Sequence, residues 1–304
     1  STDATHPSGI AVAAFDGDGQ NEILVGSISN SSLYVIEVET TSTSIAFGTQ
    51  TEIGLNGGEQ PQQVTVADFN QDGKPDFVTA CQDGNHLVYG LNQFTENPST
   101  PFDVSSPSSM SAEHSPRWVT AGDLTGDDYP DLVSLSYESG GINTIYAQVW
   151  VNQGMSDGDF NGFSSPINFK VKNAHLMTSN MAANPVIGDF DGDGYTDDFA
   201  FGMNPRNQSD VNNLFAEGMV QFVYGSSSGP TNWQSEVGSS NSDNYLNDND
   251  YVVVSGSPGY GNQAQNSPIC SLAVVPSDQL PGVGADVVIA SYGELGQWFV
   301  TQQT

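Results

Sequence analysis

Four aspartates recur through one short stretch in a pattern suited to binding a metal ion. They occupy positions 1, 3, 5 and 9 of that stretch, as Asp189, Asp191, Asp193 and Asp197. Alternate residues of an irregular loop can converge on one point, and calcium takes about six to eight oxygen ligands of this kind. Gly194, at position 6, permits the sharp turn that such a loop requires. The spacing therefore predicts a calcium-binding loop.

The residues on either side of this loop indicate strands and not helices. A helix-loop-helix calcium site would need a glutamate at about position 12, where this chain has Ala200. Short apolar runs flank the loop instead, Val186 to Gly188 before it and Phe199 to Phe201 after it. Runs of this length are typical of strands. The loop is therefore predicted to join two strands.

Three earlier stretches of the chain repeat the pattern. Aligned on position 1, the four loops start at residues 14, 68, 123 and 189, which are 54, 55 and 66 residues apart. Positions 1, 3, 5 and 9 of the first three loops are Ala14, Asp16, Asp18 and Glu22; Asp68, Asn70, Asp72 and Asp76; and Asp123, Thr125, Asp127 and Asp131. Each loop lies between two apolar runs. A fifth copy, in which residues 271–275 and 286–290 are the strands, has lost its acids.

Further apolar runs predict more strands in each repeat. Third strands are expected at residues 33–36, 86–89, 145–151 and 219–224, and fourth strands at 45–47, 102–104 and 167–171. Four strands recurring every fifty-odd residues predict an all-β fold, a β-propeller of four-stranded antiparallel blades. Five blades are expected, with six, seven or a share in a larger ring as alternatives.

The repeat also predicts the domain organisation. Residues 1–304 are expected to form a single propeller domain with a polar loop insertion around residues 226–266. The alternative for that insertion is a blade that has lost its calcium loop. The last blade lacks a fourth strand, which the segment before Ile10 could supply, thereby closing the ring.

Composition restricts the partners. Five Lys and Arg residues oppose 36 Asp and Glu residues, which gives a formal net charge of −31. Such a chain repels nucleic acids, anionic lipids and polyanionic glycans, since binding these relies on basic residues. Neutral glycans, cationic surfaces and proteins, including further copies of this chain, remain as partners.

The sequence favours an extracellular or cell-surface location. No apolar run reaches the ~18 to 20 residues of a membrane helix, so no membrane insertion is expected. The first residues do not have the charged-then-apolar pattern of a signal sequence, so a mature or excised fragment is expected. Cys81 and Cys270 are either one disulfide or two buried thiols. Asn30 and Asn207 fit the N-glycosylation pattern.

The repeated unit resembles a known family. An apolar strand, then Asp-Phe-Asx-x-Asp-Gly-x-Pro-Asp, then a second apolar strand is similar to the FG-GAP or VCBS repeats of integrin α-chain propellers, fungal propeller lectins and bacterial surface proteins. Val88-Tyr-Gly90, Val223-Tyr-Gly225 and Gly256-Ser-Pro258 resemble degenerate family signatures. The resemblance implies a calcium-stabilised propeller, and family members usually have about seven blades.

The resemblance also implies a ligand set for each loop. The family pattern uses the side chains at positions 1, 3, 5 and 9 and the main-chain carbonyl at position 7. In this chain the carbonyls belong to Gln20, Lys74, Tyr129 and Tyr195. Two to four structural calcium ions are expected. The Asp189 loop should bind best, the Asp68 loop next, then the Asp123 loop, where Asp128 replaces the glycine; the first loop, with Ala14, should be the weakest.

The sequence offers little support for catalysis. Its four histidines, His6, His86, His114 and His175, are scattered and have no metal-ligand or triad spacing. The leading hypothesis is a non-catalytic extracellular module that binds a glycan or a protein, acts in adhesion, or forms a subunit of a surface structure. The alternative is a propeller polysaccharide lyase or glycoside hydrolase.

Overall fold

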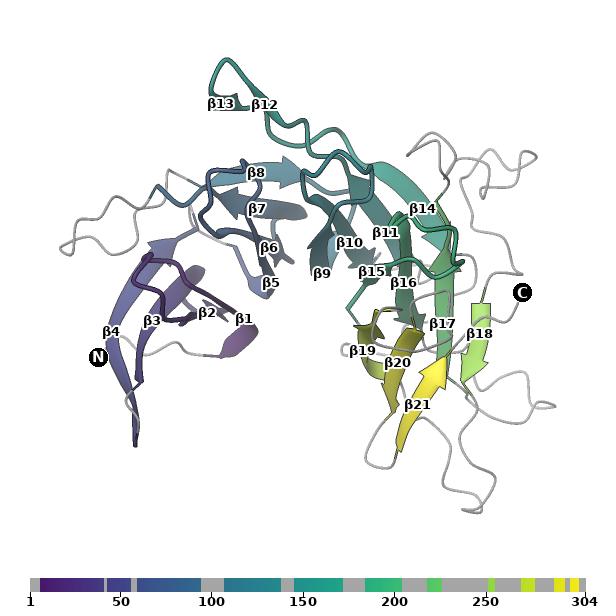
Figure 1. Ribbon diagram of the computed structural model, residues 1–304, viewed down its shortest axis with the longest axis horizontal. Coiled ribbons are helices and arrows are strands. Elements are labelled where there is room, and N and C mark those ends of the chain that lie inside the picture. Colours follow the sequence, from purple (N-terminus) through teal and green to yellow (C-terminus); the bar gives the residue numbers. More distant parts are fainter. Residues whose placement is uncertain are drawn as a thin grey trace. The chain divides into compact units, whose positions relative to one another are not determined.

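The described residues are all β. The computed structural model describes residues 6–40, 43–55, 59–93, 107–137, 145–171, 184–203, 218–225, 251–254, 269–276, 287–292 and 296–300. Within these ranges the chain forms strands β1 to β21 and no helix (Figure 1). It follows that none of the described residues forms a helix long and apolar enough to cross a membrane.

The strands of each sheet follow one another along the chain. Sheet one has the order β1-β2-β3-β4 and sheet two the order β5-β6-β7-β8. Their bounds are Pro7–Ala13 (β1), Glu22–Ser27 (β2), Ser32–Thr40 (β3), Ile45–Gly54 (β4), Pro61–Ala67 (β5), Asp76–Cys81 (β6), His86–Gly90 (β7) and Ser108–Ser111 (β8). All neighbouring pairs in these two sheets are antiparallel.

Sheet three has the same order with a small insertion. Its strands are β9 (Ser115–Gly122), β10 (Asp131–Tyr137), β11 (Ile145–Trp150) and β14 (Ile167–Val171). Between β11 and β14 the chain forms a separate hairpin of β12 (Met155–Ser156) and β13 (Asp159–Phe160). This hairpin is an addition to the strands predicted from the sequence.

Sheets four and five complete the described strands. Sheet four contains β15 (Val186–Gly188), β16 (Asp198–Met203), β17 (Gly218–Val223) and β18 (Tyr251–Val254), and sheet five contains β19 (Ile269–Val275), β20 (Val287–Tyr292) and β21 (Gly296–Val300). Their pairings are antiparallel. The predicted fold class, all-β with propeller-type four-stranded blades, is confirmed, and the number of blades stays a prediction.

Three strand assignments change. The fourth strand of sheet two is β8, and the fourth strand predicted at residues 102–104 lies outside the described residues. The fourth strand of sheet four is β18, which lies inside the segment predicted as a polar loop insertion. Its Tyr-Val-Val-Val sequence pairs with β17. Residues 7–9 belong to β1, where Pro7 pairs with Ser27 in sheet one, and residues 1–5, the rest of the segment predicted to close the ring, lie outside the described residues.

The chain divides into two compact units. The first comprises residues 1–122, 129–136 and 149–166, and the second comprises residues 123–128, 137–148 and 167–304. The prediction of a single domain is not tested by this division and stays a prediction.

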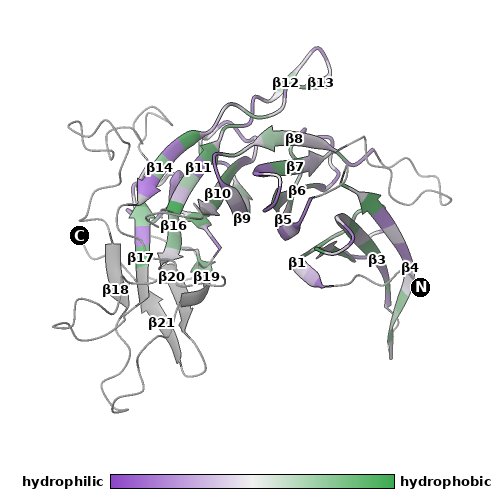
Figure 2. Ribbon diagram, turned by 180° about the vertical axis from the view of Figure 1, so that it is seen from behind, coloured by the Kyte–Doolittle hydropathy of each residue, from purple (hydrophilic) through white to green (hydrophobic). Residues whose placement is uncertain are grey.

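In the first unit, side chains from one strand enter two different cores. On β6, Phe77 and Cys81 belong to a core shared by sheets one and two, whereas Val78 and Ala80 belong to a core that includes Trp150 of β11. Successive residues of a strand point to opposite faces, so a strand buried on both sides feeds two cores. Hydrophobic colour accordingly lies along the strands in Figure 2.

One glycine in β1 allows the close approach of two sheets in this unit. A Cβ atom on Gly9 would lie 2.4 Å from the Cα atom of Gln63 in β5. The backbones therefore meet where a side chain would separate them. Both strands are also irregular at matching points of the repeat, between Pro7 and Ile10 in β1 and between Pro61 and Val64 in β5.

In the second unit, a smaller core joins sheets four and five. Phe190, Phe222 and Leu272 are buried there with Val186, Ala200 and Val220. The rings of Phe190 and Phe222 meet edge to face with centroids 5.5 Å apart, a favoured geometry for aromatic pairs. Phe190 is position 2 of the fourth loop, so this core anchors that loop.

Two phenylalanines test how much the core shared by sheets one and two contributes to stability. Phe77 is fully buried, whereas Phe47 of β4 is 69% exposed. Phe77→Ala should lower the free energy of unfolding by about 3 to 5 kcal/mol, since it leaves a cavity, and Phe47→Ala by less than about 0.5 kcal/mol. Urea unfolding followed by fluorescence measures both. Equal losses for the two variants would contradict the described core.

Candidate metal centre

The four acid loops occupy the same place in four sheets. They join the first strand to the second: β1 to β2, β5 to β6, β9 to β10 and β15 to β16. Strands on both sides therefore hold the two ends of each loop.

The loop backbones share two left-handed residues. Positions 4 and 6 have positive φ angles in every loop: Gly17 73° and Gly19 85°; Gln71 56° and Gly73 83°; Gly126 72° and Asp128 70°; Gly192 80° and Gly194 94°. Glycine adopts this conformation without steric penalty, and aspartate tolerates it better than most residues. The prediction that Asp128 takes the place of a glycine at position 6 is confirmed.

The carboxylate at position 1 accepts hydrogen bonds from amides of its own loop. Asp68 Oδ2 accepts from Gly73 N at 2.7 Å, and Asp189 Oδ2 accepts from Gly194 N at 3.0 Å. Asp123 Oδ2 accepts from the amide of Asp128 at 2.8 Å. These bonds curl each loop around its first residue. The first loop has Ala14 here and lacks this bond.

Carboxylates at positions 3 and 5 accept hydrogen bonds from the amide two residues further along the chain. In the first loop Asp16 Oδ1 accepts from Asp18 N at 3.0 Å, and Asp18 Oδ1 accepts from Gln20 N at 2.7 Å. In the fourth loop Asp191 Oδ1 accepts from Asp193 N at 3.0 Å, and Asp193 Oδ1 from Tyr195 N at 2.9 Å. Side chains that bond the backbone two residues on favour turns.

A buried carboxylate closes each of the first two loops. Glu22 Oε2 accepts from the amide of Phe15 at 2.7 Å, and Asp76 Oδ2 accepts from the amide of Phe69 at 2.9 Å. Both acids are buried, as is Asp131 at position 9 of the third loop. Position 9 thus lies beneath the loop, at the start of the second strand.

In the fourth loop this role belongs to Asp198 and not to Asp197, the predicted position 9. Asp198 Oδ2 accepts from the amide of Phe190 at 2.6 Å and from the amide of Asp191 at 3.0 Å, while Oδ1 accepts from Gly225 N at 2.8 Å. Asp197 is also buried but is not part of the carboxylate group. The fourth loop is one residue longer than the other three. Because Asp197 and Asp198 are both aspartates, the sequence pattern does not show this shift.

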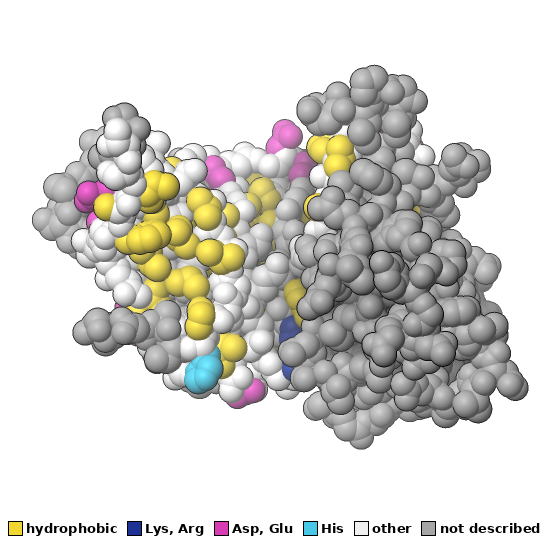
Figure 3. Space-filling view, turned by 90° about the horizontal axis from the view of Figure 1, so that it is seen from below, with side chains coloured by type: hydrophobic (Ala, Val, Ile, Leu, Met, Phe, Trp, Pro, Cys, Tyr) yellow, Lys and Arg dark blue, Asp and Glu magenta, His cyan; other side chains and the backbone are white. Residues whose placement is uncertain are grey.

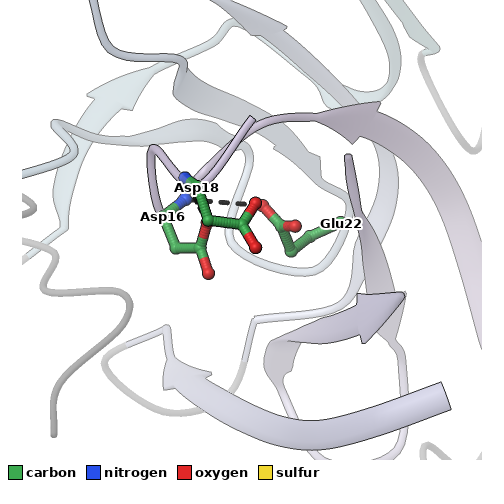
Figure 4. A group of neighbouring side chains, drawn as sticks. All are labelled: Asp16, Asp18 and Glu22. Carbon is green, nitrogen blue, oxygen red and sulfur yellow. Dashed lines mark hydrogen bonds between the residues drawn. The ribbon is translucent and has the colours of Figure 1, made fainter. Parts of the chain in front are cut away.

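Two loops bring three carboxylates together. One oxygen from each of Asp16, Asp18 and Glu22 lies within 4.8 Å of the others, as in the group formed by Asp189, Asp191 and Asp198. Figure 4 shows the first group, with Asp16 and Asp18 facing Glu22 across the loop. Converging carboxylate oxygens are the donor set that calcium prefers. The first loop, predicted to bind calcium most weakly, is one of these two, and the predicted order of affinities stays a prediction.

The second and third loops contain neutral residues at position 3. Asn70 Oδ1 accepts from Asp72 N at 3.2 Å, and the Thr125 hydroxyl oxygen is buried and makes no hydrogen bond. A buried oxygen without a hydrogen-bond partner carries a free-energy cost that a cation would remove. The donor set of these loops therefore fits calcium as well, with fewer charges.

The residues at position 7 lie at the outer part of the loops. Gln20 Oε1 accepts from the amide of Thr40 at 3.1 Å, and Lys74 Nζ lies 3.6 Å from Asp72 Oδ2. Tyr195 is 51% exposed, and the Tyr129 ring lies beside Gly154. The predicted use of their main-chain carbonyls as ligands stays a prediction.

Burial strongly affects the ionisation of these acids. Burial raises the pKa of Asp76 to about 7 and the pKa of Asp198 to about 7, and nearby carboxylates add to both shifts. Burial also raises the pKa values of Glu22, Asp16 and Asp191. Desolvation disfavours the charged form, and neighbouring negative charges disfavour it further. A cation at the loop would reverse this preference.

Cys81 is a buried free thiol, which agrees with one of the two alternatives predicted for the cysteines. Burial is the main cause that raises its pKa, and the negative charge of Glu59 adds to it. Glu59 in turn pairs with His86 Nε2, while His86 Nδ1 lies 2.6 Å from the Gly84 carbonyl oxygen. This arrangement ties the segment before β5 to the turn after β6.

The repeats match a known protein family. A protein-family profile described as FG-GAP-like repeat matches twice, over residues 15–79 and 68–134. Each match begins at one acid loop and ends in the strand that follows the next loop. The predicted FG-GAP resemblance is confirmed over these residues. A search of curated proteins finds no match.

The pKa shifts predict how pH affects the metal-free protein. Asp76 and Asp198 bind protons more tightly in the folded state than in the unfolded state, so stability should fall as pH rises from about 4 to about 7. In excess chelator the melting temperature should be higher at pH 5 than at pH 8. Asp76→Asn should reduce this difference, since the amide does not titrate. Equal melting temperatures at both pH values would contradict the assigned burial of these acids.

Proposed function

Taking as premise that the chain contains FG-GAP-like repeats, we propose that it is a non-catalytic, calcium-stabilised recognition module. FG-GAP-like repeats are typical of propeller-type adhesion or recognition domains. The observation that carries the calcium part is the convergence of Asp16, Asp18 and Glu22, and of Asp189, Asp191 and Asp198. The role of the ions is structural, because these acids close the loops that join the strands.

Charge balance supports calcium. The chain carries a net charge of −31, and clustered carboxylates repel one another when ionised. Binding of calcium requires these groups to be deprotonated, and the free energy of binding then adds to that of folding. Calcium would therefore stabilise the fold at neutral pH.

The first unit supports a binding role through its surface. Figure 3 shows hydrophobic side chains gathered on one face of the described residues. In the described part of the chain, the most exposed large hydrophobic residues include Ile10 and Val12 of β1 and Ile45 and Phe47 of β4. Exposed apolar groups on a strongly acidic protein favour contact with a protein or a neutral glycan over contact with an anionic partner.

Few of the aromatic side chains that the structure describes are available to stack on a sugar. Trp150 and Tyr146 are buried, and Trp150 Nε1 donates to Ser134 Oγ at 2.9 Å, so neither is free to stack on a sugar. Trp233, Tyr245 and Tyr260 lie outside the described residues. Tyr195, in the fourth loop, has an exposed ring beside the proposed calcium site.

The proposed location is extracellular or at a cell surface. Extracellular calcium reaches the millimolar range, in which loops with few protein ligands are still occupied. The partners proposed are a glycan, an extracellular protein or further copies of this chain, and no nucleic acid or membrane insertion is proposed.

Removal of calcium should destabilise the protein. At calcium concentrations about 100 times the dissociation constant, each site adds about 2.7 kcal/mol, so excess chelator should lower the melting temperature by about 5 to 20 °C. Calorimetric titration should count two to four ions. Asp191→Asn should weaken one site at least tenfold, whereas Asp157→Asn in the β12–β13 turn should not. A melting curve unchanged by chelator would disprove the structural role.

A binding screen and an activity screen on one calcium-loaded preparation separate the functions. Binding to a neutral glycan or a protein without release of reducing ends is the expected result, because the described carboxylates of the loops are engaged with backbone amides. Release of reducing ends would instead favour the lyase or hydrolase alternative. Concentration-dependent sedimentation without ligand binding would indicate a self-associating surface subunit.

A further inference from the structure

Two buried asparagines occupy the same place in successive repeats. Asn92 lies two residues beyond the end of β7, and Asn152 lies two residues beyond the end of β11. Both side chains are almost fully buried, at 1% and 2% exposure. A buried amide needs hydrogen-bond partners, and the partners of Asn92 and Asn152 occupy equivalent positions in their repeats.

Each asparagine bonds to two loops at once. The amide nitrogen of the Asn92 backbone donates to Asp76 Oδ1 at 2.7 Å, and its side-chain Nδ2 donates to the carbonyl oxygen of Phe15 at 2.7 Å. Asp76 closes the second loop, whereas Phe15 is position 2 of the first loop. Asn92 therefore joins the loop of its own repeat to the loop of the repeat before.

Asn152 repeats this arrangement one sheet later. Its backbone amide donates to Asp131 Oδ1 at 2.8 Å, and Nδ2 donates to the carbonyl oxygen of Phe69 at 3.0 Å. Nδ2 also donates to the Pro130 carbonyl oxygen at 3.1 Å, and Oδ1 accepts from Gly154 N at 2.8 Å. All polar atoms of this side chain are thus engaged.

The bonds form one continuous chain through the first unit. Glu22 accepts a hydrogen bond from the Phe15 amide, and the Asn92 side chain donates to the Phe15 carbonyl oxygen. The Asn92 backbone amide donates to Asp76, which also accepts from the Phe69 amide. The Asn152 side chain then donates to the Phe69 carbonyl oxygen, and its backbone amide donates to Asp131. Coupling between sites travels through contiguous packed networks of this kind.

We propose that Asn92 and Asn152 are positioning residues that couple each acid loop to the preceding one, so that cation binding at one loop strengthens binding at its neighbour. The proposal rests on the proposed binding of calcium. A cation that fixes Asp76 also fixes the backbone of Asn92, and the Asn92 side chain then holds the first loop. The coupling is reciprocal, as thermodynamic linkage requires.

The fourth repeat lacks this link. Gly225 occupies the corresponding position and donates its backbone amide to Asp198, but it has no side chain to reach another loop. A Cβ atom on Gly225 would lie 2.2 Å from the Cγ atom of Asp197. The extra residue of the fourth loop therefore fills the space that an asparagine would need. The fourth loop contacts the third through a different bond, from the Thr196 hydroxyl to the Asp123 carbonyl oxygen at 3.4 Å.

Hydrogen exchange measured by mass spectrometry on the full chain tests the coupling. The readout is the calcium concentration that half-protects the amides of residues 15–22 in the first loop. Asp72→Asn disables the second loop and should raise that concentration about 5- to 100-fold. In an Asn92→Ser background the same change should raise it less than twofold. Equal shifts in both backgrounds, or no shift in the wild type, would overturn the proposal.

The next link provides the matched control. Asn152→Ser should leave the response of the first loop to Asp72→Asn intact, and should abolish the response of the second loop to Asp127→Asn. If Asn92→Ser fails to fold, this second cycle decides the question by itself. Asn161→Ser, which removes an exposed amide that donates to the Gln153 carbonyl oxygen, should change neither response.

A metal-free measurement separates failure of the coupling from failure of calcium binding. In excess chelator, Asn92→Ser should speed exchange of the first-loop amides several-fold and leave those of residues 189–198 unchanged. Unchanged exchange in the first loop would overturn the link itself. No calcium-dependent protection at any loop of the wild type would refute the proposed calcium binding, while this metal-free result still decides whether the link exists.

Discussion

Burial of a carboxylate beneath each loop is the constraint on which the described repeats depend. Glu22, Asp76 and Asp198 accept amides from the loop above them, which a neutral or apolar side chain at that place could not do to the same extent. Burial, however, disfavours the negative charge that makes them good acceptors. Either a proton or a bound cation would offset this cost, and converging carboxylate oxygens are the donor set that calcium prefers.

The stacking of sheets in the first unit explains why the loops repeat so closely. Adjacent residues of β6 enter two different cores, so neither Phe77 nor Val78 can shift without disturbing packing on its own side. A fixed register at β6 fixes Asp76 at its first residue, and hence the loop that precedes it. Asn92 and Asn152 add a polar connection to this apolar one. Register, loop geometry and loop-to-loop contacts in this unit thus have a common origin.

Much of this arrangement follows from local sequence, and the rest does not. Alternating apolar runs predict paired strands, and acids at alternate positions with Gly or Asp at position 6 predict the loops, because both signals span only a few residues. Asp198 escapes prediction because a one-residue shift between two aspartates leaves the composition unchanged. Strand β18 escapes because its partner β17 ends 28 residues earlier and the intervening segment is polar. Asn92 and Asn152 escape because their partners lie 77 and 83 residues away.

The same hydrogen bonds bear on the choice between recognition and catalysis. A general base needs an oxygen that is free to take a proton from a substrate within about 3 Å. In the described loops the carboxylates at positions 1 and 3, and those of Glu22, Asp76 and Asp198 at the loop base, are already engaged with backbone amides, and a second role as cation ligands would occupy them further. These bonds support the structural role proposed for the acids over a catalytic one. The proposed recognition would then use exposed side chains outside the loops.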